Sequence, residues 1–208
     1  MEELLVKDFR ISVTNFSKGV QTIVLKFDDI SISIDAIFVK KRAFSEFGGQ
    51  PLSTLIEQVK FLSREVNPED NIAFLATETE WCLNPGAFKL RFMKFFPSNI
   101  LNLDICRHHY DISKRNTDFY RKQPEYSEER WSFQLPFEVF KQSVIHASLS
   151  LLKEYGYKGI NSHWCDYTET FPLGTLMDVI GCNAQSEKSS KTDVFKEFEH
   201  LLMMLREV

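Results

Sequence analysis

The sequence predicts an α+β fold: a mainly antiparallel, twisted sheet of about six or seven strands with two helices on one face and a C-terminal helix. Three observations lead to this prediction. Many short segments alternate apolar and polar residues, three longer segments repeat apolar residues at three- and four-residue steps, and 19 phenylalanines stand against only 8 glycines and 7 prolines. Alternation with one polar face is typical of strands covered on one side only, so the helices and the phenylalanines are expected to fill that side.

The clearest two-residue period lies in residues 30–35, where three isoleucines alternate with two serines and an aspartate. This pattern predicts a half-buried strand. Turn sequences at Asn84-Pro85-Gly86 and Pro97-Ser98-Asn99 predict that the strands beside them form an antiparallel meander. The other predicted strands cover residues 9–13, 20–27, 77–83, 87–95, 99–107 and 131–135.

The helical period predicts a first helix over residues 52–62, behind a proline that suits a first helical turn. A second helix is expected from Pro136 to about Tyr155, with Gly156 as its C-terminal stop. Residues 109–129 and 159–182 show no regular period and are expected to be irregular.

A third helix is expected at about residues 193–206, after the polar stretch NAQSEKSSK. The chain therefore divides into one α+β domain over residues 1–182, a polar linker over 183–191 and a C-terminal helix over 192–208.

Composition favours a cytoplasmic protein without a membrane partner. The net charge is −4, the N-terminus lacks the pattern of a signal peptide, and no stretch of 18 residues is free of charge. Four widely spaced cysteines without a CxxC pair indicate reduced thiols rather than a disulfide framework.

Known catalytic and nucleotide-binding motifs are absent: the sequence has no P-loop, G-x-G-x-x-G, G-x-S-x-G or H-E-x-x-H. A four-ligand nitrogen and sulfur site could be assembled from Cys106, His109, His163 and Cys165, but their spacing matches no common zinc pattern. We therefore expect no catalytic residue, no metal and no cofactor. The alternative is a hydrolase or nucleic-acid-processing enzyme with His108, His109, His163 and Cys165 near a pocket.

Charged residues leave two further interpretations open. Basic residues concentrate between residues 86 and 115 and could form a surface for RNA, although the net negative charge argues against a nucleic-acid partner. They are Lys89, Arg91, Lys94, Arg107, Lys114 and Arg115. Glu78 and Glu80 share one strand face, where they could supply a general acid or form an ordinary solvated surface.

Acidic and aromatic residues in the predicted connections favour a non-enzymatic protein-binding module with a basic partner. Glu65, Glu69 and Asp70 follow the first helix. The residues expected to bind the partner lie in the two irregular segments: Glu125, Glu128, Glu129, Trp164, Asp166, Tyr167 and Glu169.

The order of elements adds a resemblance. A strand and a helix precede the meander TETEWCLNPGAFKLRFMKF, and the strand RWSFQL runs directly into the helix PFEVFKQSVIHASLSLLKEYG. Over about residues 25–156 this order resembles the small α+β immunity-type proteins of bacterial polymorphic toxin systems. The resemblance implies a non-enzymatic protein that binds and neutralises a cognate toxin domain, and it transfers no functional residue.

Overall fold

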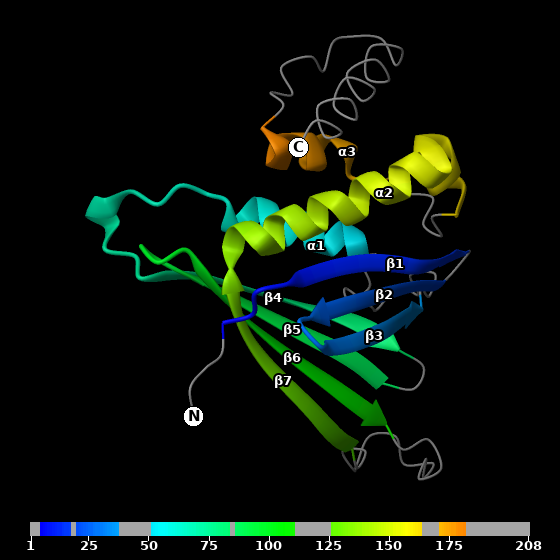
Figure 1. The fold of residues 1–208 in the computed structure, drawn as a ribbon, viewed down its shortest axis with the longest axis horizontal. Coiled ribbons are helices and arrows are strands. Elements are labelled where there is room, and N and C mark those ends of the chain that lie inside the picture. Colours follow the sequence, from blue (N-terminus) through cyan, green and yellow to red (C-terminus); the bar gives the residue numbers. More distant parts are fainter. Residues whose placement is uncertain are drawn as a thin grey trace, which may run out of the picture.

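The computed structural model describes residues 5–17, 20–37, 51–83, 86–110, 126–163 and 171–181 and shows an α+β fold (Figure 1). Its strands are β1 (Phe9–Ser17), β2 (Val20–Phe27), β3 (Ile30–Ile37), β4 (Phe74–Leu83), β5 (Gly86–Phe95), β6 (Ile100–Tyr110) and β7 (Tyr126–Pro136). Its helices are α1 (Pro51–Leu62), α2 (Phe137–His163) and α3 (Leu173–Ile180), with a short 3-10 helix η1 (Pro68–Asp70).

The prediction of a single sheet is wrong. The strands form a three-stranded sheet, β1-β2-β3, and a four-stranded sheet, β4-β5-β6-β7, both antiparallel. Alternation identifies strands but does not specify pairing between segments that are separated by a helix. Strands β3 and β4, which are separated by α1 in the chain, contact each other but belong to different sheets.

The meander is confirmed as β4, β5 and β6, and the turn at Pro97 lies between β5 and β6. Strands β6 and β7 are longer than predicted and take up residues at both ends of the stretch 109–129. The two sheets also meet at one backbone contact, because Val6, just before β1, donates its N–H to the carbonyl of Gln134 on β7 at 2.7 Å.

Phenylalanines fill the space between the two sheets and the helices. The ring of Phe27 on β2 stacks on Phe133 of β7 at 3.7 Å between centroids and 2° between planes. Phe140 of α2 contacts Phe9 of the three-stranded sheet and Phe92 of the four-stranded sheet, at 5.8 and 5.6 Å. Aromatic pairs of this kind add to the hydrophobic stabilisation that burial supplies.

Polar contacts fix α1 at both ends. The fully buried Gln21 of β2 accepts the N–H of Leu52 in the first turn at 3.1 Å, which satisfies a donor that has no partner within the helix. At the other end, the buried Lys94 of β5 donates to the carbonyl of Leu62 at 2.8 Å. In between, Trp81 of β4 donates to the hydroxyl of Thr54 at 2.8 Å.

Gly156 breaks α2 rather than ending it. This glycine has φ 65° and ψ 165°, which is not helical, and helical residues resume and continue to His163. The expectation of an irregular segment over 159–182 is corrected by α3, which packs on α1 through an ion pair between Lys60 and Asp178 at 2.9 Å. The predicted linker and the C-terminal helix lie outside the described residues.

Figure 1 shows the helices together on one side of the molecule and strands β4–β7 on the other. The outer face of the four-stranded sheet points away from the helices, which pack on its inner face. None of the described helices combines the length and apolar character needed to cross a membrane.

Candidate functional site

Three side chains that can bind metal ions meet on the outer face of the four-stranded sheet. Cys106 and His108 are two residues apart on β6, so they point to the same face. Leu103 and Ile105, which precede Cys106 on the same strand, are buried on the inner face. Because successive residues of a strand point to opposite faces, Cys106 and His108 lie on the outer face. Glu128 of β7 lies directly opposite His108 in the antiparallel register, and so completes what we call the Cys-His-Glu cluster.

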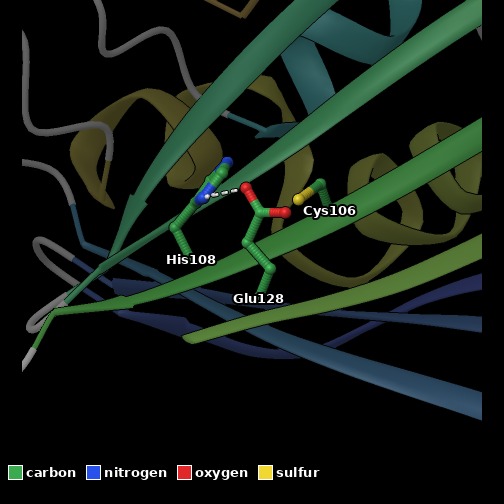
Figure 2. A group of neighbouring side chains, drawn as sticks. All are labelled: Cys106, His108 and Glu128. Carbon is green, nitrogen blue, oxygen red and sulfur yellow. Dashed lines mark ion pairs between the residues drawn. The ribbon is translucent and has the colours of Figure 1, made fainter. Parts of the chain in front are cut away.

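The carboxylate of Glu128 lies between the imidazole of His108 and the thiol of Cys106 (Figure 2). The Nδ1 atom of His108 is 3.4 Å from Oε1 of Glu128. One potential ligand atom from each of the three residues lies within 4.8 Å of the other two. The side chains of His108 and Glu128 are 22% and 25% exposed, so both are partly covered by their neighbours.

Arg130 provides the positive charge beside this carboxylate. Its Nε and Nη2 atoms donate to Oε2 of Glu128 at 2.8 and 2.5 Å, while its own side chain is 73% exposed. The hydrogen bond to Glu128 raises the pKa of Arg130, which therefore keeps its charge. Arg130 thus orients Glu128 and leaves Oε1 facing His108.

The electrostatics of the cluster do not favour a nucleophilic cysteine. Burial, followed by the nearby carboxylate of Glu128, raises the pKa of the free thiol of Cys106 above 9.0. A catalytic cysteine needs the opposite, a lowered pKa that supplies thiolate at neutral pH. A divalent cation among the three side chains reverses this situation, because it stabilises thiolate and carboxylate together.

The structure brings together only part of the His/Cys set that the sequence indicated. His109 follows His108 on β6, where its backbone pairs with Ser127 of β7. His163 is the last residue of α2, a helix that packs on the inner side of the sheet. Cys165 lies outside the described residues.

Glu128 was expected in a loop, as a residue that binds a partner, and the sequence did not connect it with Cys106 and His108. The C-x-H spacing on an alternating strand was a usable signal for two of the three cluster residues. The third depends on the register between β6 and β7, which pairs His108 with Glu128 across a long connection.

Two expected partner-binding residues lie in a strand rather than in a loop. Glu128 and Glu129 belong to β7, and Glu129 approaches Nη1 of Arg107 at 3.6 Å. The remaining expected residues are Glu125, Trp164, Asp166, Tyr167 and Glu169, and all of them lie outside the described residues.

The basic residues of β5 and β6 are divided between the two faces of the sheet. Lys89 lies on the outer face and pairs with Glu78 at 3.2 Å, whereas Lys94 is buried on the inner face. Arg107 also points inward, where its guanidinium lies 5.5 Å from the ring centroid of Phe88. Arg91, two residues after Lys89 on β5, is exposed on the outer face with it, so the pleat leaves two of the four cationic side chains there and places the other two on the inner face.

The connection between α1 and β4, residues 64–74, combines acidic and apolar side chains, and we call it the acidic connection. Glu65, Glu69 and Asp70 are exposed, and no ion pair involves them within the part of the chain that the structure describes. The large apolar side chains of Ile72 and Phe74 are 42% and 46% exposed. Figure 1 shows this connection extending away from the rest of the molecule.

Local hydrogen bonds give the acidic connection a defined shape. The side chain of Asn67 caps η1 by accepting the N–H of Glu69 at 3.2 Å, and its carbonyl accepts the N–H of Asp70 at 2.9 Å. Asn71 then adopts a left-handed conformation, φ 52°, which asparagine tolerates better than most residues. Phe74 finally joins β4 and packs on Phe95 at 5.8 Å between ring centroids.

Comparison of the chain with protein-family models, curated proteins and solved structures gave no match.

Proposed function

We propose that this chain is a non-enzymatic protein-binding module, and that it binds a basic protein domain through the acidic connection. The observation that carries the proposal is the exposure of Ile72 and Phe74 beside three carboxylates that form no ion pair among the described residues. Interfaces commonly combine a few large apolar anchors with a charged surround.

Charge specifies the kind of partner. Residues 64–74 contain three acidic side chains and one basic one, Arg64, whose guanidinium lies 4.8 Å from the ring centroid of Phe61, and the whole chain carries a net charge of −4. Such a surface attracts a positively charged partner and accelerates the encounter, whereas it repels a polyanion such as a nucleic acid. A basic protein domain therefore complements this segment.

The shape of the segment supports the same proposal. The capped η1 and the packing of Phe74 on Phe95 hold the connection in one conformation. A preformed surface loses less conformational entropy on binding than a flexible one. Apolar side chains on a projecting, preformed segment are well placed to enter a pocket on another protein.

The immunity-like function is the narrower form of this proposal. Neutralising a toxin requires tight binding to its catalytic domain, and domains that act on nucleic acids are commonly basic because they bind polyanions. An acidic, projecting segment with apolar anchors is suited to cover such a domain.

Pull-down and calorimetry test the proposal. The immobilised chain is incubated with an extract of its source cells, and retained proteins are identified by mass spectrometry, purified and titrated. Replacement of Glu65 and Glu69 by Gln and of Asp70 by Asn should weaken binding about tenfold at low salt and less at high salt. Phe74→Ser should weaken binding about tenfold or more at either salt concentration.

A charge-matched control removes the same number of carboxylates elsewhere, by Asp29→Asn, Glu80→Gln and Glu154→Gln, and should leave affinity within about twofold. Equal affinity of all variants, an acidic partner, or no retained protein would each contradict the proposal. For the narrower form, the gene of the identified partner is expressed in cells whose growth it inhibits. Co-expression of the wild-type chain should restore growth, and co-expression of the Phe74→Ser variant should not. Growth inhibition that the wild-type chain does not relieve would rule out neutralisation.

A further inference from the structure

We propose that Cys106, His108 and Glu128 form a binding site for a divalent transition-metal ion of the zinc type. The site is independent of the acidic connection, because Phe74 pairs with Phe95 at one end of β5 and His108 pairs with Ala87 at the other end. Its supporting observations are the identity of the three ligands, their distances and the strands that hold them.

The donor set suits zinc and its neighbours in the periodic table. Zinc is bound by cysteine sulfur, histidine nitrogen and carboxylate oxygen, and the cluster supplies one of each. Calcium and magnesium prefer oxygen ligands and would not use a thiolate. The mixed set therefore favours a transition metal over the alkaline-earth ions.

The distances approach those of a tetrahedral site. Two ligand atoms that each lie about 2.0–2.1 Å from a tetrahedral ion are about 3.4 Å apart. The Nδ1 atom of His108 and Oε1 of Glu128 are 3.4 Å apart before any metal is added. A sulfur at about 2.3 Å would lie about 3.6 Å from the oxygen. Since one potential ligand atom from each residue lies within 4.8 Å of the other two, a shift of the thiol on the order of 1 Å brings the three to these separations.

The sheet supplies the rigidity that a metal site needs. Cys106 and His108 share a face of β6 because they are two residues apart, and Glu128 is held opposite His108 by the β6–β7 ladder. Arg130 binds Oε2 of Glu128, which leaves the other oxygen available for the ion, and it also hydrogen-bonds the thiol of Cys106, a contact that the sulfur gives up when it binds the metal. It therefore acts as a positioning residue from outside the ligand set.

Binding has a defined proton balance. The ion forms a bond to the sulfur of Cys106 while the thiol proton passes to solvent, and His108 binds as the neutral imidazole. Affinity should therefore rise with pH, because the thiol of Cys106 must release its proton to bind the ion. Three protein ligands leave a fourth position, where water completes the tetrahedron.

Cobalt titration tests the site, because a bond between sulfur and Co²⁺ gives a charge-transfer absorption band in the near ultraviolet. The purified full chain, kept reduced with a phosphine, should show the band with about one equivalent of Co²⁺, and Zn²⁺ should displace it. Cys106→Ser should abolish the band. His108→Ala and Glu128→Gln should each weaken binding by about tenfold to a hundredfold.

Matched controls replace a cysteine, a histidine and a carboxylate outside the cluster. Cys82→Ser, His146→Ala and Glu80→Gln should retain the band and the affinity of the wild type. Far-ultraviolet circular dichroism of every variant separates loss of ligands from loss of fold. Absence of the band in the wild type, its retention in Cys106→Ser, or its loss in Cys82→Ser would overturn the proposal, and none of these outcomes bears on the acidic connection.

Discussion

Replacing Phe27 by alanine should remove the main aromatic contact between the two sheets. Phe27 is 1% exposed, and its ring lies 3.7 Å from Phe133 of the other sheet and 4.7 Å from Phe9, between centroids. The substitution removes about 140 Å² of buried apolar surface. At about 25 cal/mol per Å², the lost hydrophobic stabilisation is about 3.5 kcal/mol. With the cavity that remains, the free energy of unfolding should fall by about 4 kcal/mol.

Urea denaturation followed by tryptophan fluorescence measures this loss, with Phe74→Ala as the control. Phe74 is 46% exposed, so its removal should cost only about 1 kcal/mol. A double-mutant cycle with Phe133→Ala should give a coupling energy of about 1 kcal/mol from the stacked pair. A loss below about 2 kcal/mol for Phe27→Ala, or no coupling to Phe133, would refute the inference that this stack joins the sheets.

Three further predictions concern polar groups. Burial lowers the pKa of Lys94 below 10.5 in the folded chain. Between the folded-state and unfolded-state pKa values the unfolded chain binds more protons, so the free energy of unfolding rises with pH in that window. Urea titrations at about pH 7 and about pH 10 should show the wild type becoming more stable relative to Lys94→Met at the higher pH, and a pH-independent difference would contradict this. Trp81→Phe removes the hydrogen bond to Thr54 and should cost about 1 kcal/mol, whereas Trp81→Phe in a Thr54→Val background should cost measurably less. Alkylation of Cys106 by iodoacetamide, followed by mass spectrometry of its peptide, should reach half its maximal rate above pH 9.0, and Glu128→Gln should lower that midpoint; an unchanged midpoint would show that the carboxylate does not act on the thiol.

Local sequence patterns predicted the elements of this fold better than their arrangement. The three isoleucines of residues 30–35 and the turn at Pro97 correctly located strands and a hairpin, because side-chain alternation and turn chemistry are local. The division into two sheets depends on β3 and β4, which meet without a ladder, and no local pattern encodes that. Similarly, Gly156 marked a real break in the helix, but whether the chain resumes a helix afterwards depends on packing against the rest of the fold.

The alternation of side chains along β5 and β6 separates the predicted basic cluster and brings Cys106 and His108 to one face. Lys94 and Arg107 appeared beside Lys89 in the sequence, but their positions along the strands place them on the inner face, where Lys94 caps α1 and Arg107 lies over an aromatic ring. Cys106 and His108 are separated by an even number of positions and therefore share the outer face. Their third partner could not be found from spacing, since Glu128 reaches them only through the β6–β7 register. The spacing of residues along one strand thus decides which side chains share a face, and the register between strands decides which residues of the next strand join them. The spacing can be read from the sequence, whereas the register is seen only in the folded structure.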